Sequence, residues 1–192
     1  MRKKSHISLA RYIVHNSDDE NLKKHKYSFY LGSILPDCKP SFVYRKHEMD
    51  GTFPDVKVMI DRLINGKNQK PVVNKKKYYV NLGQVTHFVA DYFTFPHNKT
   101  YEGSLKDHCS YEEVLKKRLR EYLKKGKDKR HRTIGMEFQS PEKLCDFIQH
   151  SHDKYLERKL NIDEDIRHII SVNHVIVEGI SALLRKVHHK AS

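Results

Sequence analysis

The sequence predicts an all-α fold, and three observations lead to that class. Apolar residues recur at spacings of three and four along most of the chain, which is the period of a helix with one buried face. No stretch alternates between apolar and polar residues for long enough to indicate a strand. Prolines and glycines end several of the periodic stretches. A chain of 192 residues is expected to build one core, so we expect a single domain over 1–192.

Each predicted helix is bounded by a residue that starts or stops helical geometry. Pro36 and Pro96 end two helices, because the residue before a proline is disfavoured in the helical region. Gly66 and Gly126 end two more, and Ser140 provides an N-terminal cap. In chain order, the predicted helices are a first segment with Ile7, Ala10, Tyr12, Ile13 and Val14, then about 22–35, 54–65, 71–94 and 105–125, a segment that starts at Ser140, and about 162–188.

The chain carries a formal net charge of +13, from 37 Lys and Arg against 24 Asp and Glu. Much of this charge is local, because residues 114–132 contain ten Lys and Arg but only two acidic residues. Such a surface attracts polyanions, and both nucleic acid and an anionic lipid surface qualify as partners. A solvated helix face explains the same cluster. The chain has no zinc-finger spacing, no aromatic RNA-binding strand pattern and no helix-turn-helix pair, so charge alone identifies no substrate.

The composition also bears on the compartment. No stretch approaches the roughly 20 apolar residues of a transmembrane helix, and the basic N-terminal segment is not followed by the apolar region of a signal peptide. The three cysteines are widely spaced and include no CxxC pair, which argues against a disulfide framework. These features predict a cytoplasmic protein and leave its oligomeric state open.

Histidine and carboxylate pairs at helical spacing are more frequent than chance predicts. With 14 histidines and 24 carboxylates in 192 residues, fewer than two His-x-x-x-Asp/Glu pairs are expected at random, and the chain has four. Residues four apart share one helix face, so each pair could bind one cation or form an ordinary ion pair. The four pairs are His15/Asp19, His87/Asp91, His108/Glu112 and His174/Glu178.

Two of these pairs have a context that favours metal binding. His87 and Asp91 lie in a mainly apolar stretch, where an unpaired imidazole and carboxylate are costly to bury and a cation stabilises both. His97 follows Pro96, and His108/Glu112 open the next helix. The further candidates upstream are His6, Asp37 and His47. A donor set of imidazole and carboxylate without thiolate suits zinc in an open, catalytic site.

The order of these residues resembles the zinc-dependent phospholipase C family, with the single-strand-specific zinc nucleases as more distant relatives. The resemblance covers roughly residues 5–115. It rests on His6, Leu31-Gly32-x-x-x-Pro36-Asp37, His47, Gly83-x-x-x-His87-x-x-x-Asp91-x-x-x-x-x-His97 and His108-x-x-x-Glu112.

The resemblance implies an all-α fold with a zinc cluster in a core cleft. It implies that His47, His87 and Asp91 bind one zinc ion, with Asp37 beside it as ligand or base. It further implies that His97, His108 and Glu112 bind a second ion, and that His6 and a bridging Asp91 bind a third. Secreted members use an N-terminal Trp at the third ion. This chain has no tryptophan, so the amine of Met1 is the candidate substitute.

The implied activity is zinc-dependent hydrolysis of a phosphoric ester, with two or three ions. A metal-bridged hydroxide would attack the phosphorus of a phosphodiester, and Asp37 would orient or deprotonate it. The substrate is a phosphate ester, with a phospholipid head group as one candidate. The alternatives are a nuclease or nucleotide phosphodiesterase on the same scaffold, favoured by the basic charge, and a catalytically weak zinc-binding interaction protein.

Overall fold

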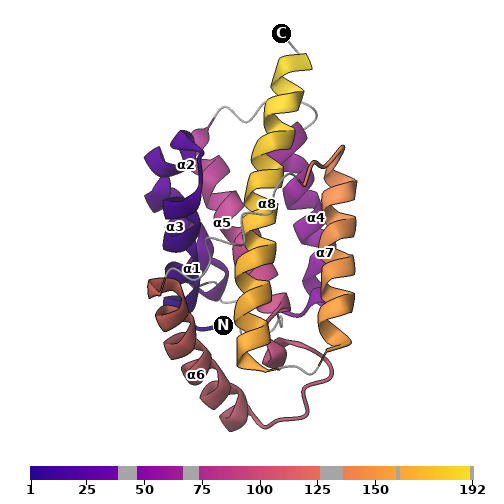
Figure 1. Cartoon of the computed structure of the whole chain (residues 1–192). Helices are drawn as coiled ribbons and strands as arrows, with labels where there is room; N and C mark the ends of the chain where they lie inside the picture. The colour runs from indigo at the N-terminus through magenta and orange to yellow at the C-terminus, as the bar shows by residue number, and fades with distance from the viewer. Residues whose placement is uncertain (39–46, 67–73, 126–135, 159–160, 191–192) are drawn as a thin grey trace.

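The structure of the chain, a computed structural model, describes residues 1–38, 47–66, 74–125, 136–158 and 161–190. These residues form α-helices and short 3-10 turns and contain no strand, which confirms the all-α class (Figure 1). The elements are α1 (Lys3–Asn16), α2 (Glu20–Lys24), α3 (Lys26–Ile34), η1 (Pro36–Cys38), α4 (Met49–Asn65), α5 (Lys75–Tyr92), η3 (Phe95–His97), α6 (Leu105–Lys124), α7 (Pro141–Leu156) and α8 (Ile162–Lys190).

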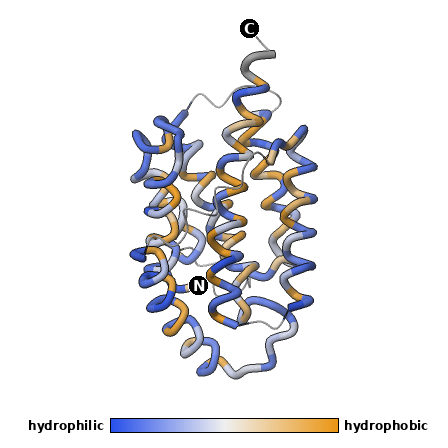
Figure 2. The backbone as a smooth tube through the Cα atoms, viewed as in Figure 1, coloured by the Kyte–Doolittle hydropathy of each residue, from blue (hydrophilic) through white to orange (hydrophobic). Residues whose placement is uncertain are grey.

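The C-terminal helix α8 organises the bundle. It runs through the middle of the molecule, with α1 to α3 on one side and α4 and α7 on the other (Figure 1). Figure 2 shows hydrophobic and hydrophilic residues sharing each helix, as expected where only one face is buried. On α8 the buried side chains include Ile169, Ile176 and Ile180, none of which is exposed. Among the described helices, none combines the length and the apolar content that crossing a bilayer requires.

Two predicted helices differ from the structure, one by a break in its middle and the other by an earlier start. The helix predicted over 22–35 is two helices, because His25 leaves helical geometry (φ −104°, ψ 20°) and stacks its ring on Tyr79 of α5 at 5.2 Å. The helix predicted from residue 54 begins at Met49 and contains Pro54 in its second turn. Burial of Met49 and Phe53 in the core outweighs the hydrogen bond that Pro54 cannot donate.

The remaining helix ends agree closely with the prediction. Gly66 ends α4 at φ 76°, a backbone conformation that glycine adopts without strain. Ser140 caps α7 by accepting the N–H of Lys143 at 3.4 Å. The helix predicted over 71–94 runs over Lys75–Tyr92, so it starts four residues later than predicted. The predicted start at residue 71 and the predicted end at Gly126 lie outside the described residues.

Helices α3 and α5 approach each other closely through two glycines. A Cβ atom added to Gly32 would lie 2.1 Å from the backbone oxygen of Val80. A Cβ atom added to Gly83 would lie 2.3 Å from the backbone oxygen of Phe29. Only hydrogen fits at these positions, so the two glycines fix how near the backbone of α3 comes to α5. Ser33 and His87 follow one residue and four residues after them, and the same approach brings them into contact.

Gly83→Ala is therefore expected to lower the free energy of unfolding by about 1–3 kcal/mol, because a backbone atom cannot move aside for the added methyl group. The measurement is urea unfolding followed by circular dichroism. The matched control is Gly179→Ala on α8, where the nearest atoms belong to the side chains of Phe138 and Leu144 at 3.0–3.1 Å and can adjust. Equal unfolding free energies for the two variants would contradict this account of the α3–α5 crossing.

Candidate metal centre

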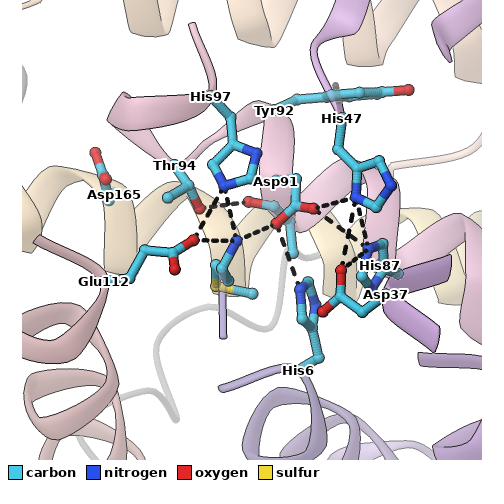
Figure 3. A network of polar contacts seen from close by, with 12 residues as sticks. His6, Asp37, His47, His87, Asp91, Tyr92, Thr94, His97, Glu112 and Asp165 are labelled. Carbon is cyan, nitrogen blue, oxygen red and sulfur yellow. Dashed lines mark hydrogen bonds and ion pairs between the residues drawn. The ribbon is translucent and has the colours of Figure 1, made fainter. Parts of the chain in front are cut away.

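The structure brings all eight sequence-predicted site residues to one end of the bundle. Their contacts link them into one continuous group, and Figure 3 shows these residues from close by, with all of them except His108 labelled. The residues come from six parts of the chain: His6 on α1, Asp37 in η1, His47 just before α4, His87 and Asp91 on α5, His97 in η3, and His108 and Glu112 on α6.

Asp37, His47, His87 and Asp91 form the first part of the group. Oδ2 of Asp91 lies 3.0 Å from Nδ1 of His47 and 3.3 Å from Nε2 of His87, and these two ring nitrogens are 3.1 Å apart. Oδ1 of Asp37 lies 3.5 Å from Nε2 of His87 and 3.8 Å from Nδ1 of His47. Two imidazoles and two carboxylates therefore face a common point.

His97, His108 and Glu112 form the second part. Oε1 of Glu112 lies 3.2 Å from Nε2 of His97 and 3.2 Å from Nε2 of His108. The spacing of four residues on α6 explains the His108–Glu112 contact, since such residues share one helix face. The turn η3, which contains Pro96, brings His97 back over the end of α5 to the same carboxylate.

The N-terminal amine of Met1 lies between the two parts. It is 2.5 Å from Oδ1 of Asp91, 3.1 Å from Oε1 of Glu112 and 3.0 Å from Nε2 of His97. Burial alone lowers the pKa of this amine, but Asp91 and Glu112 outweigh that effect and raise the pKa above its ordinary value. The amine therefore occupies the place where a cation neutralises both carboxylates.

Asp91 joins these groups, because its two oxygens face different partners. Oδ2 faces His47 and His87, and Oδ1 faces the Met1 amine and, at 3.4 Å, Nε2 of His6. Its side chain is only 1% exposed. Burial raises the pKa of this carboxyl, but the Met1 ammonium and the surrounding histidines hold it well below its usual range.

The orientation of His87 is set by the backbone of α3. Its Nδ1 lies 2.9 Å from the carbonyl oxygen of Ser33, which can only accept, so Nδ1 carries a proton and, in the neutral ring, Nε2 is the atom that has the lone pair. Nε2 is the atom that faces Asp37 and Asp91. A backbone carbonyl in this position is the outer contact that orients histidine ligands in metal sites.

The surroundings of the His6 ring test whether a metal ion fits within this group of side chains. His6 is 1% exposed, it stacks on the ring of His87 at 3.9 Å, and neither of its ring nitrogens makes a hydrogen bond among the described residues, although Nε2 approaches Oδ1 of Asp91 to 3.4 Å. Burial lowers the pKa of His6 to about 3, so the ring is neutral at neutral pH and offers a lone pair. A buried ring nitrogen without a partner is costly, and a metal ion removes that cost.

Among the residues that the structure describes, three sets of side chains could hold a metal ion by the spacing of their donor atoms. Within each set the donors lie within 4.8 Å of one another. The sets are His6, His87 and Asp91; Asp37, His47 and His87; and His97, His108 and Glu112. Five imidazoles and three carboxylates without a thiolate are a donor set that suits zinc.

A cleft of about 1160 Å³ opens onto the group. Asp37, His47, His97, His108 and Glu112 line it, whereas His6, His87 and Asp91 lie behind these residues and do not. The walls of the cleft are basic and include Arg2, Lys3, Lys4 and Lys116. A ligand in this cleft therefore meets the candidate metal-binding side chains at the floor and positive charge around it.

The other two histidine–carboxylate pairs of the sequence serve the packing of the bundle. Asp19 caps α2 by accepting the N–H groups of Asn21 and Leu22. Glu178 accepts a hydrogen bond from the hydroxyl of Ser17 at 2.8 Å. Neither pair lies in a set of three candidate ligands within the described residues.

Several polar residues near the site were not found from the sequence. His152, on α7, is 6% exposed, and its Nε2 lies 2.8 Å from Oδ1 of Asn98. Asp165 was not singled out, yet it is buried and accepts three hydrogen bonds close to the site. Both residues lie on helix faces that pattern analysis assigns to core or solvent, and their partners come from distant segments, so no local signal identifies them.

Comparison with known proteins identifies a match to one protein family. A family model described as zinc dependent phospholipase C matches residues 5–162, which is most of the chain. No curated protein and no solved structure matches the chain significantly. The matched range includes all eight candidate ligands and ends at the start of α8.

Proposed function

The chain belongs to the zinc-dependent phospholipase C family, and we propose that it is a metal-dependent phosphodiester hydrolase that acts as one domain over 1–192. The convergence of five histidines and three carboxylates at and directly behind the floor of one cleft carries this proposal. The buried ring nitrogens of His6, which make no hydrogen bond among the described residues, support it, since a cation within the group would bind them.

In this proposal two or three zinc ions occupy the group. Asp37, His47, His87 and Asp91 would hold one, and His97, His108 and Glu112 a second. Asp91 and His6, with the amine of Met1 beside them, would hold a third. When bound, such ions lower the pKa of water toward neutrality and neutralise charge on phosphoryl oxygens.

Asp37 is the residue we assign as general base. It lines the cleft, whereas Asp91 lies behind it, so Asp37 can contact the water that attacks phosphorus. Burial raises the pKa of Asp37 and outweighs the opposing effect of His87, which makes this carboxylate a better proton acceptor. Attack in line with the leaving alkoxide requires the ester to lie along the cleft, with its phosphate facing the floor.

The basic walls of the cleft favour an anionic substrate. Arg2 and Lys116 share one carboxylate, that of Glu113, at 3.3 and 2.6 Å. Lys3 and Lys4 are both exposed and form no ion pair with another described residue. The cleft therefore has an excess of positive charge outside the group of ligands. This observation supports the second candidate function, cleavage of nucleic acid or nucleotides, over hydrolysis of a zwitterionic phospholipid such as phosphatidylcholine.

We expect Asp37→Asn to lower kcat for bis(p-nitrophenyl) phosphate by about 100-fold or more, because the amide cannot accept the proton of the attacking water. Zinc content is measured on the same preparation by atomic emission, and the parent enzyme is assayed before and after chelation. The matched control is Asp146→Asn on α7, which is exposed and pairs with Lys143 at 3.3 Å.

An unchanged rate in Asp37→Asn would remove this residue from the mechanism. A parent protein that binds zinc but shows no chelator-sensitive hydrolysis of any phosphodiester would favour the third hypothesis, a zinc-binding interaction protein.

Reversing the charge of Lys3 and Lys4 in the cleft wall should lower the rate on a polyanionic substrate without changing the rate of the hydrolytic step itself. For Lys3→Glu/Lys4→Glu we expect kcat/KM on single-stranded DNA to fall about tenfold or more at low salt, because the walls then repel the polyanion. The rate on bis(p-nitrophenyl) phosphate should stay close to that of the parent.

The control for this charge reversal is Lys75→Glu/Lys76→Glu at the start of α5, which does not line the cleft. It changes the net charge equally and should leave both rates unaltered. Faster hydrolysis of phosphatidylcholine vesicles than of DNA by the parent enzyme would overturn the assignment of an anionic substrate.

A further inference from the structure

Asp165 is a buried carboxylate that the proposed reaction does not use. It lies in the first turn of α8, just beyond the residues that the family model matches, and none of it is exposed. Ile166, Ile169 and Ile170, which follow it on α8, are buried in the core and hold this end of the helix in place. A buried carboxylate is costly unless it is hydrogen-bonded.

Three donors from three different elements satisfy this carboxylate. The backbone N–H of Phe95, in η3, donates to Oδ2 at 2.9 Å, and the hydroxyl of Tyr111, on α6, donates to the same oxygen at 2.9 Å. The hydroxyl of Tyr155, on α7, donates to Oδ1 at 2.7 Å. Asp165 thus connects α8 with η3, α6 and α7.

The two donors that share Oδ2 lie next to candidate ligands. Phe95 is two residues before His97, and Tyr111 immediately precedes Glu112. Their rings also contact each other, with centroids 6.1 Å apart. His97 and Glu112 lie 3.2 Å apart and belong to the same candidate metal set. The donor to Oδ1, Tyr155, lies on a helix that carries no candidate ligand.

We propose that Asp165 is a positioning residue that holds η3 against α6, so that His97 and Glu112 face one metal ion together with His108. The inference rests on the proposed function, because it takes these three residues as ligands. Helix α8 then has a role in the site besides its role in the core, although it lies almost entirely outside the family match.

A purely structural role for Asp165 gives a different expectation. If the carboxylate only joins helices, the hydrogen bonds of Tyr111 and Tyr155 are equivalent, since each connects one helix with α8. If it positions ligands, the hydrogen bond of Tyr111 affects metal binding and that of Tyr155 affects stability alone. Figure 3 places Asp165 on the side of Glu112 and Thr94, away from His47 and Asp37. The candidate set of Asp37, His47 and His87 therefore serves as an internal reference.

The test compares Tyr111→Phe with Tyr155→Phe in the full chain, because each variant removes one hydroxyl and keeps the ring. The metal-free proteins are titrated with zinc against a competing chelator, and with cobalt to follow the visible absorption of each site. We expect Tyr111→Phe to weaken one binding step by about 10–100-fold, with an altered cobalt spectrum for that step. Tyr155→Phe should stay within about threefold of the parent in every step, although both variants lower the urea midpoint.

Two other outcomes would contradict either the positioning role of Asp165 or the proposed metal centre. Equal metal affinities in the two variants, with a parent that binds zinc, would overturn the positioning role of Asp165 and leave the proposed function intact. A parent that binds no zinc would overturn the proposed metal centre, and the inference with it. Asp165→Asn, which keeps the shape of the side chain, should reproduce the effect of Tyr111→Phe on the same binding step.

Discussion

The structure depends on neutralising the negative charge of the carboxylates in the candidate metal centre. Asp91 is 1% exposed, and Asp37 and Glu112 lie within contact of the same group of side chains. Carboxylates in such surroundings are stable only when cations or hydrogen-bond donors face them. The Met1 ammonium supplies one positive charge, and the histidines around it have lone pairs to offer. Metal ions would neutralise the carboxylates and bind the histidine lone pairs. The same ions would therefore stabilise the packing of the helices around the group and supply the proposed chemistry.

The fold supplies rigid supports for this group. The glycines of the α3–α5 crossing let the carbonyl of Ser33 orient His87, and Asp165 holds the segments that carry His97 and Glu112. Catalytic geometry is best maintained when its side chains are held by second contacts on packed elements. The cleft leaves the floor accessible, so the centre is buried on one side and open to a substrate on the other.

The sequence predicts the helices and the candidate ligands better than it predicts the buried polar residues around them. Helical periodicity, the stop at Gly66 and the cap at Ser140 are local signals, and the structure agrees with them. The eight candidate ligands were found because their spacing follows a family pattern. The break at His25 and the burial of His152 and Asp165 depend on partners far along the chain, and no local pattern contains those contacts.

The most direct test of the shared metal group is a crystal of the protein grown with zinc, with anomalous differences measured at the zinc absorption edge. The account predicts at least two strong peaks, one among Asp37, His47, His87 and Asp91 and one among His97, His108 and Glu112. A map without peaks at these side chains, or with zinc bound only elsewhere on the surface, would contradict it.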